Sequence, residues 1–367
     1  MRVLFAAGGT GGHIYPALAL ARYLCASEGA EALFVGTERG MEKDLVPASG
    51  FELEKIPVTG LERRLSLQAG RALLMAGAGV WSARRIMARF RPDVVVGMGG
   101  YVAGPVVLSA ALAGKPTVIH EQNAIPGLTN VLLSRLSRRV CLSFPGSERY
   151  FPVRAQTVLT GNPRASEAVL AVGLSEFLPA GLLPGVPLLL CVGGSHGAAR
   201  LNAVFAQCLE PVLAACDVQV VYITGQRYFH ELERALLPLG SRFPRRLHLL
   251  PYHAAFPELL AKTTLAVSRA GATTCAEITA LGVPAILVPS PNVTNNHQEY
   301  NARALADRGA ALLAGEAELS STALSAKLLA LLRDPKALRQ MSAASKALGY
   351  PDAAARMAAV LLEVLQK

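Results

Sequence analysis

Short runs of apolar residues alternate along the chain with longer segments in which apolar positions recur at the helical spacing. In the first half, the patterns predict strands near 2–7, 31–35, 93–97, 116–120, 138–142 and 157–160, and helices near 14–27, 66–90, 103–113 and 127–136. In the second half, they predict strands near 187–192, 218–223, 247–250, 264–267 and 284–288, with helices between them and at 318–333, 335–347 and 352–365. Such alternation is typical of parallel sheets with crossover helices and indicates an α/β fold.

Two glycine-rich segments each follow a predicted strand and precede a predicted helix. They are Gly-Gly-Thr-Gly-Gly-His at 8–13 and Gly-Gly-Ser-His-Gly at 193–197. Glycine lets backbone N–H groups approach a phosphate closely, and a helix start behind it carries partial positive charge, so each segment predicts an anion site. The repetition indicates two facing nucleotide-fold domains. The Gly-Asn-Pro break at 161–163 ends the sixth predicted strand and places the domain boundary after residue 163.

The composition is that of a folded protein, with 52% hydrophobic and 17% charged residues in a chain of 367. The first residues lack the long apolar run of a signal peptide, because glycines interrupt them from position 8, so we expect a cytosolic protein. Six cysteines stand singly in apolar segments. We interpret them as buried thiols in a reducing compartment, and not as disulfide partners or zinc ligands.

Positive charge suggests a surface role for one segment. The formal net charge is +10, and residues 63–91 contain seven arginines and no acidic residue, interleaved with leucines and a tryptophan. Candidate membrane contacts are Leu73, Leu74, Trp81, Arg84, Arg85 and Arg89. Peripheral contact with anionic lipid and an ordinary half-solvated helix both stay open as interpretations. No apolar run reaches the ~18–20 residues that span a bilayer, and no stacking or zinc motif indicates nucleic-acid binding.

Four further loops follow predicted strands, at the edge where parallel sheets bind ligands. In the first half these are Gly-Met-Gly-Gly-Tyr at 97–101 and the four polar residues 120–123, which end a buried strand. In the second half they are 268–277 and 295–299. Buried polar groups are costly unless they bond a ligand or one another, so we expect the loops to line one cleft between the domains.

Together, these loops resemble the bacterial MurG-type N-acetylglucosaminyltransferases, through the segments at 8–13, 97–101, 120–123, 127–130, 193–197, 268–277 and 296–301. The resemblance implies a GT-B fold, with two facing Rossmann-like domains, parallel sheets and an inter-domain cleft. It implies an acceptor-binding, membrane-associating domain at 1–163, a donor-binding domain at 164–345, and a C-terminal helix at 346–367 that crosses back to the first domain.

The same resemblance implies an activity. It is the inverting transfer of N-acetylglucosamine from UDP-GlcNAc to the C4 hydroxyl of undecaprenyl-diphospho-N-acetylmuramoyl-pentapeptide, the step from lipid I to lipid II in peptidoglycan synthesis. UDP-GlcNAc would be a co-substrate and no cofactor is implied. The enzyme would lie at the cytoplasmic face of the inner membrane as a peripheral protein, with an anionic membrane surface and cell-wall synthesis proteins as candidate partners.

The family's binding positions carry over onto this chain as expectations. In the first half, Thr10, Gly11, Gly12 and Asn123 would lie near the transferred sugar and phosphates, and Gly99, Gly100 and Tyr101 would meet the acceptor diphosphate. In the second half, Ser195 would meet the donor diphosphate and His253, in place of a usual aliphatic residue, would contact uracil through its backbone. The stretch of Ala272, Thr273, Thr274, Cys275, Ala276 and Glu277 would bind diphosphate and ribose, with Glu277 on the ribose hydroxyls and Gln298 near the sugar.

One position departs from the family's pattern. The known motif has arginine two residues after the proline of Gly-Asn-Pro, whereas here Arg164 follows Pro163 directly and Ala165 occupies that place. Arg164 is therefore either a donor ligand or part of a structural ion pair.

The residues also supply the chemistry that inverting transfer needs: a base for the acceptor hydroxyl and positive charge for the departing diphosphate. His13 is the candidate base or acceptor-orienting group, and helix capping is its structural alternative. Glu121 either assists as base or orients His13, or is a strand-end carboxylate paired with backbone N–H groups. Helix starts after Ser195 and Gly271, with Arg269, would balance the diphosphate. The loops contain no Asp-x-Asp metal motif, so we expect a metal-independent mechanism.

Rival classes are less consistent with these features. A GT-B enzyme acting on another lipid or on a natural product would lack the combination of 97–101 and 120–123, and a UDP-sugar epimerase has no use for the basic, apolar segment 63–91. A nucleotide-binding scaffold without activity would not need polar loops in both halves.

Overall fold

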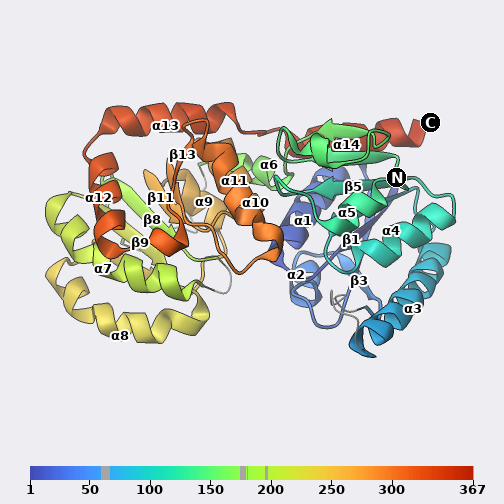
Figure 1. Cartoon of the computed structure of the whole chain (residues 1–367), viewed down its shortest axis with the longest axis horizontal. Coiled ribbons are helices and arrows are strands. Elements are labelled where there is room, and N and C mark those ends of the chain that lie inside the picture. Colours follow the sequence, from blue (N-terminus) through green and yellow to red (C-terminus); the bar gives the residue numbers. More distant parts are fainter. Residues whose placement is uncertain (59–66, 174–178, 180, 195–196, 367) are drawn as a thin grey trace. The chain divides into compact units, whose positions relative to one another are not determined.

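The chain forms two compact units in a computed structural model that describes residues 1–58, 67–173, 179, 181–194 and 197–366, with 67–74 and 76 described by their backbone only. Unit 1 comprises Met1–Ser166 and Asp352–Lys367, and unit 2 comprises Glu167–Pro351 (Figure 1). The chain thus passes into unit 2 three residues after the predicted boundary. It returns to unit 1 at Asp352, six residues later than predicted, because the helix before this point belongs to unit 2.

Unit 1 is built on a seven-stranded sheet in the order β3-β2-β1-β4-β5-β6-β7, in which each adjacent pair is parallel. Its strands are β1 (Arg2–Ala7), β2 (Glu31–Gly36), β3 (Glu52–Lys55), β4 (Val94–Gly99), β5 (Thr117–Glu121), β6 (Arg139–Leu142) and β7 (Thr157–Leu159). Its helices are α1 (Gly11–Glu28), α2 (Glu42–Ala48), α3 (Leu67–Phe90), α4 (Ala103–Leu112), α5 (Leu128–Leu133), the 3₁₀ helix η1 (Ser147–Tyr150) and α14 (Ala353–Gln366). The helix α6 (Arg164–Leu170) lies at the boundary of the two units.

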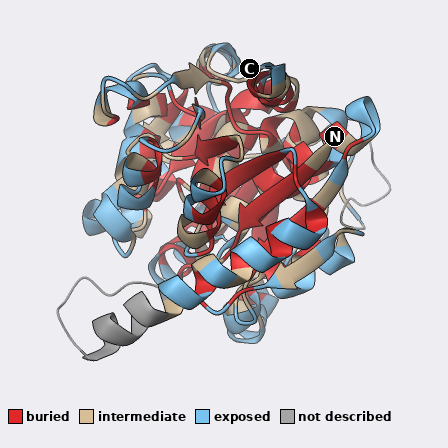
Figure 2. Cartoon of the chain, turned by 90° about the vertical axis from the view of Figure 1, so that its right-hand side faces the viewer, coloured by how far each residue is buried: buried red, intermediate tan, exposed pale blue. Residues whose placement is uncertain are grey.

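The central strands of unit 1 are buried on both faces, because helices cover each side of the sheet. Figure 2 shows the strands in red and the outward surfaces of the helices in pale blue. One core joins strand residues such as Phe5 and Phe34, whose rings stack, to apolar residues of α1 and to Met357, Leu361 and Val364 of α14. The last helix of the chain is therefore part of the core of the first unit.

Unit 2 repeats this plan on a six-stranded parallel sheet in the order β10-β9-β8-β11-β12-β13. Its strands are β8 (Leu188–Val192), β9 (Gln219–Ile223), β10 (Leu247–Leu250), β11 (Leu265–Ser268), β12 (Ala285–Leu287) and β13 (Ala311–Leu313). Its helices are α7 (Ala199–Ala215), α8 (Gln226–Arg242), α9 (Phe256–Ala261), α10 (Ala272–Leu281), α11 (His297–Ala306), α12 (Ser321–Leu332), α13 (Pro335–Ala347) and the 3₁₀ helices η2 (Thr294–Asn296) and η3 (Glu316–Glu318).

The prediction of parallel sheets with crossover helices is confirmed, and so is every strand that the apolar runs predicted. The missed elements include β3, whose sequence is Glu-Leu-Glu-Lys, the short β13, the helices α2 and α6, and the 3₁₀ helix η1. The predicted helix at 127–136 is shorter and ends at Leu133. All six cysteines are free thiols, of which Cys25 and Cys216 are half-buried and the others buried.

Candidate active site

The first glycine loop connects β1 to α1. Gly9 has a φ of +89°, which glycine adopts without strain, and α1 begins at Gly11. Thr10 occupies the N-cap position, but its side chain accepts no capping hydrogen bond. Thr10 and Gly12 are exposed. Because the first N–H groups of a helix have no partner within the helix, this arrangement suits an anionic ligand.

His13 lies in the first turn of α1 and bonds back to the loop. Its Nδ1 is 3.1 Å from the carbonyl oxygen of Gly8. A carbonyl can only accept, so Nδ1 carries the hydrogen and the lone pair of the neutral ring is on Nε2. The His13 side chain thus donates to a carbonyl at the end of a strand. A helix-capping side chain would instead accept a hydrogen bond from a backbone N–H at the start of the helix, so this contact is not a cap. In this tautomer Nε2 is the ring nitrogen that can accept a proton.

The turn after β4 packs directly on the first glycine loop. A Cβ on Gly100 would lie 2.2 Å from the Gly8 carbonyl oxygen, and a Cβ on Gly99 would lie 2.6 Å from Cδ2 of His13. Both glycines have positive φ, of +78° and +107°. The structure therefore places Gly99 and Gly100 against His13 and its loop, and the neighbouring Tyr101 is exposed.

Glu121, at the end of β5, is a buried carboxylate with a full set of donors. Oε1 accepts from the backbone and side-chain nitrogens of Asn123, and Oε2 accepts from Gly127 N at 3.0 Å and Asn130 Nδ2 at 2.8 Å. Burial raises the pKa of Glu121, and the donors from Asn123, Asn130 and Gly127 oppose this shift. Since both oxygens are occupied, the geometry favours the structural interpretation of Glu121, as the group that shapes the 121–127 loop and orients Asn123.

The neighbouring His120 is also buried and links three strand ends. Its Nε2 is 3.0 Å from the Gly161 carbonyl oxygen and 3.1 Å from Ser143 Oγ, and its Nδ1 is 3.2 Å from Gln122 Nε2. Gln122 Nε2 in turn donates to the Met98 carbonyl oxygen. Burial lowers the pKa of His120 to about 4, while the Gly161 hydrogen bond raises it and the charge of His13 lowers it.

This shift predicts an acid-dependent loss of stability. In the unfolded chain His120 gains a proton near pH 6.5, whereas in the folded protein it stays neutral down to about pH 4. Unfolding therefore takes up a proton between these values, and the free energy of unfolding falls by up to about 3 kcal/mol as the pH decreases through this window. Urea unfolding at a series of pH values measures the effect. In His120→Gln this component of the pH dependence should vanish, and an unchanged slope would contradict the prediction.

In unit 2, the first turn of α10 carries most of the predicted donor residues. Gly271 is the N-cap without a side-chain capping bond, and Thr273 and Thr274 are half-buried at the helix start, which suits a diphosphate. Ala272, Cys275 and Ala276 belong to the same two turns. Glu277 is only 3% exposed and lies in the second turn of the helix.

The other predicted donor residues have more varied surroundings. Gln298, in the first turn of α11, uses Oε1 to accept from Ser290 N at 2.9 Å, so its amide nitrogen is the atom suited to a hydroxyl. His253 is half-buried, and its Nε2 has no hydrogen-bond partner among the described residues. Burial lowers the pKa of His253, and the charge of Glu258 raises it. Ser195 lies outside the described residues.

Arg269 differs from the expectation. Its guanidinium forms an ion pair with Glu316 and donates to the carbonyl oxygens of Val288 and Pro289 at 3.2 and 3.1 Å. It therefore ties the end of β11 to the segment after β12, and the predicted role in neutralising the diphosphate is not supported by this arrangement.

Arg164 and the basic helix also have defined contacts. The guanidinium carbon of Arg164 lies 5.1 Å from the centre of the Tyr15 ring on α1, a cation–π contact within unit 1.

On α3, Trp81 is 60% exposed, and Arg85 lies over its ring. Arg84 is exposed too, whereas Arg89 pairs with Glu54. Leu73 and Leu74 lie in α3, but their side chains are outside the described set.

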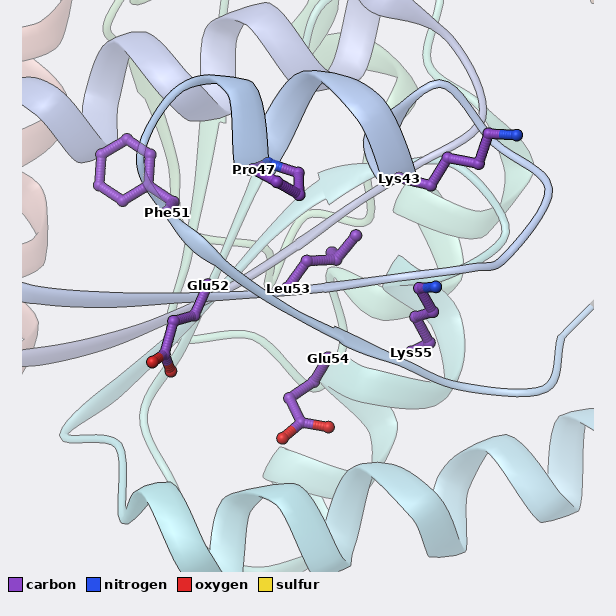
Figure 3. A pocket seen from close by; sticks show the side chains of 7 residues that line it. All are labelled: Lys43, Pro47, Phe51, Glu52, Leu53, Glu54 and Lys55. Atoms are coloured by element: carbon purple, nitrogen blue, oxygen red, sulfur yellow. The ribbon is translucent and has the colours of Figure 1, made fainter.

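A hollow of about 450 Å³ lies elsewhere, beside the edge strand β3. Figure 3 shows its lining, from α2, β3 and the segment between them: Lys43, Pro47, Phe51, Glu52, Leu53, Glu54 and Lys55. It contains none of the predicted site residues.

Sequence reasoning missed a buried carboxylate next to the first glycine loop. Glu42, at the start of α2, has no exposed surface, and its Oε2 accepts from Gly9 N at 2.9 Å. No motif in the sequence singles it out, and the fold brings it to the loop.

Comparison with known proteins identifies the class to which these features belong. The glycosyltransferase family 28 N-terminal domain matches residues 3–142, and the glycosyltransferase family 28 C-terminal domain matches residues 188–357. The paired sheets with glycine loops at their strand ends are thus those of a GT-B glycosyltransferase, as predicted.

Similarity over the full length is more specific. The UDP-N-acetylglucosamine–N-acetylmuramyl-(pentapeptide) pyrophosphoryl-undecaprenol N-acetylglucosamine transferase of Bacillus licheniformis is 43% identical over 366 residues, 99% of each chain. The crystal structure of Acinetobacter baumannii MurG matches with a TM-score of 0.76 and 30% identity over 99% of both chains. A UDP-GlcNAc 2-epimerase from Neisseria meningitidis has a TM-score of 0.72 over 99% of this chain and all of its own, but at 15% identity it shows the fold alone. The chain belongs to the MurG family of N-acetylglucosamine transferases, which confirms the predicted resemblance.

Proposed function

We propose that this chain transfers N-acetylglucosamine from UDP-GlcNAc to the C4 hydroxyl of undecaprenyl-diphospho-N-acetylmuramoyl-pentapeptide, converting lipid I to lipid II. The observation that carries the proposal is the match, at 43% identity and across 99% of both chains, to a relative named for this transfer. UDP-GlcNAc is then a co-substrate.

The base in this reaction is Nε2 of His13. Its Nδ1 bonds the Gly8 carbonyl oxygen and its ring packs against Gly99, so the ring is held in the tautomer whose lone pair is on Nε2. The acceptor O4 loses its proton to Nε2 and forms a bond to C1 of N-acetylglucosamine, while the bond from C1 to the diphosphate oxygen breaks and UDP leaves with the electron pair. Attack opposite the leaving group inverts the anomeric carbon.

Charge on the leaving diphosphate is balanced by backbone dipoles. The first turn of α10 offers N–H groups without a side-chain cap, flanked by Thr273 and Thr274. Glu277 accepts hydrogen bonds from the ribose hydroxyls, which selects nucleoside donors with a complete ribose.

A transfer assay tests the proposal. Purified protein is incubated with radiolabelled UDP-GlcNAc and a lipid-linked muramoyl-pentapeptide, and label in the lipid product is measured. We expect transfer only when the acceptor is present. Conversion of UDP-GlcNAc without acceptor would indicate the epimerase alternative, and transfer to diacylglycerol but not to the muramoyl lipid would indicate a different acceptor class.

The membrane contact is proposed for the surface formed by α3, α4 and α5 of unit 1. In these helices α3 packs against α4 and α4 against α5, and α4 and α5 expose large apolar side chains: Leu112 at 69%, Leu128 at 63% and Leu132 at 54%. We propose that these side chains, with Trp81 and the exposed arginines of α3, face the membrane. Within the described residues, no helix is long and apolar enough to cross a bilayer.

We expect Arg84→Glu/Arg85→Glu to reduce binding to anionic vesicles more than tenfold. Each basic side chain near an anionic surface contributes ~1 kcal/mol, and reversal replaces attraction by repulsion. Co-sedimentation with phosphatidylglycerol vesicles at low salt measures the effect, and calorimetry checks that UDP binding is unchanged.

The matched control is Arg234→Glu/Arg308→Glu, which makes the same change of charge at two exposed arginines of unit 2, outside the proposed surface. Its sedimentation should fall much less than that of Arg84→Glu/Arg85→Glu. Equal sedimentation of the double variant and the unmodified protein would contradict the proposed surface.

A further inference from the structure

Glu42 is buried where the reaction chemistry described so far has no role for it. Both carboxylate oxygens accept hydrogen bonds: Oε1 from Thr37 N at 2.8 Å and Thr37 Oγ1 at 2.7 Å, and Oε2 from Gly9 N at 2.9 Å. Gly40 N donates to Thr37 Oγ1 at 3.2 Å and extends the network. A set consisting of donors alone fits an ionised carboxylate.

Three glycines make room for this side chain. A Cβ on Gly40 would lie 1.9 Å from Oε2, a Cβ on Gly36 would lie 2.4 Å from Cγ, and a Cβ on Gly8 would lie 2.8 Å from Oε1. The strand ends of β1 and β2 and the turn before α2 therefore enclose the carboxylate on three sides. A buried charge is costly to maintain, so its retention next to a ligand loop calls for an explanation.

Glu42 is linked to His13, the proposed base, through the single peptide group between Gly8 and Gly9. The N–H of Gly9 and the C=O of Gly8 belong to the same peptide unit. Glu42 accepts from its N–H, and His13 Nδ1 donates to its C=O. We propose that Glu42 is a positioning residue that orients His13 and increases its basicity through the Gly8–Gly9 peptide.

The physical basis is the polarisation of hydrogen bonds in series. A carboxylate on the N–H side of a peptide shifts electron density toward its carbonyl oxygen, which makes that oxygen a stronger acceptor. The Gly8 carbonyl then holds Nδ1–H more firmly and stabilises the imidazolium that forms when Nε2 takes a proton. A carboxylate performs this task by direct contact in serine hydrolases; here one peptide is interposed. This inference rests on the proposed role of His13 as the base.

The test is Glu42→Gln, which keeps the shape of the side chain and removes its charge. We expect kcat to fall about tenfold or more, as for the loss of a charge-assisted hydrogen bond, with the KM for UDP-GlcNAc nearly unchanged. The acid limb of the kcat profile should move to lower pH, because a less stabilised imidazolium loses its proton more readily. An acid limb that stays in place would overturn the proposal.

A double-mutant cycle separates this role from a purely structural one. If Glu42 acts through His13, Glu42→Gln should have little further effect on kcat in a His13→Ala background. Independent, multiplying losses would overturn the proposal. Where the Gln variant does not fold, Glu42→Asp, which draws the carboxylate back from Gly9 by one methylene, goes through the same cycle.

Thr37→Val is the matched control. It removes one donor from Oε1 and leaves the Gly9 contact to Oε2 in place, so its effect on kcat should be much smaller than that of Glu42→Gln. These variants also distinguish a failure of the proposed base, His13, from a failure of the proposed role of Glu42. Full activity of His13→Ala would refute His13 as the base, whereas an inactive His13→Ala beside a fully active Glu42→Gln would refute only the role of Glu42.

Discussion

We expect His13→Ala to lower kcat by ~10²–10⁴-fold, the usual contribution of general-base catalysis. The loss should fall on kcat and not on donor affinity, because a base acts on the acceptor hydroxyl in the transition state and takes no part in binding UDP-GlcNAc. Steady-state kinetics with a lipid-linked acceptor, together with calorimetric titration of UDP, measure both quantities on the same preparation.

A further variant decides whether His13 acts as a base in the reaction or has a structural role only. His13 Nδ1 bonds the Gly8 carbonyl oxygen at 3.1 Å, so removal of the ring also costs some stability. His13→Gln is the control, since its amide can donate to the same carbonyl but cannot accept a proton at neutral pH. If the Gln variant kept most of the kcat of the unmodified protein, His13 would be a structural residue.

For Glu277→Ala we expect the KM for UDP-GlcNAc to rise tenfold or more. Each hydrogen bond from a ribose hydroxyl to a carboxylate is worth ~1.5–3 kcal/mol, and in the proposed role Glu277, 3% exposed, would accept them away from competing water. Calorimetric titration with UDP should give a matching loss of affinity.

Ribose selectivity provides the more specific measurement. The unmodified protein should bind 2′-deoxy-UDP more weakly than UDP, and Glu277→Ala should lose this discrimination because the group that reads the hydroxyl is gone. Thermal unfolding of the variant checks that α10 is intact. Unchanged UDP affinity in a folded variant would remove Glu277 from the donor site.

The fold was predictable where burial dictated the sequence. Central strands such as β4 and β8 are covered on both faces, and this requires the uninterrupted apolar runs that the pattern analysis detects. The edge strand β3 is open on one side and tolerates Glu52, Glu54 and Lys55, so its sequence carries no such run. The three residues of β13 are too few to show any period.

The sequence predicted the glycine-rich loops of the candidate site, but not the contacts of a carboxylate such as Glu42. Glycine-rich loops can be recognised in the sequence, because few other residues adopt a positive φ or allow two backbone segments to pack closely. The contact of Gly100 with the Gly8 carbonyl oxygen is an example. Glu42 could not be recognised, because its partner Gly9 is 33 positions away in the chain and is a backbone N–H that every residue except proline possesses. The ion pair of Arg269 with Glu316 could not be recognised for the same reason, since it spans 47 positions.

The return of α14 to unit 1 constrains how the protein is made. Met357, Leu361 and Val364 complete a core whose other members come from α1, α2 and the strands β1, β2, β4, β5 and β6. During synthesis on the ribosome, the amino-terminal half therefore emerges with part of its apolar interior uncovered, and it remains so until more than 180 further residues of unit 2 have been translated. Unit 2 is continuous in sequence and can close as soon as it emerges. The unit that begins the chain is thus the last to be finished, and a nascent or prematurely terminated polypeptide exposes the surface against which its final helix packs.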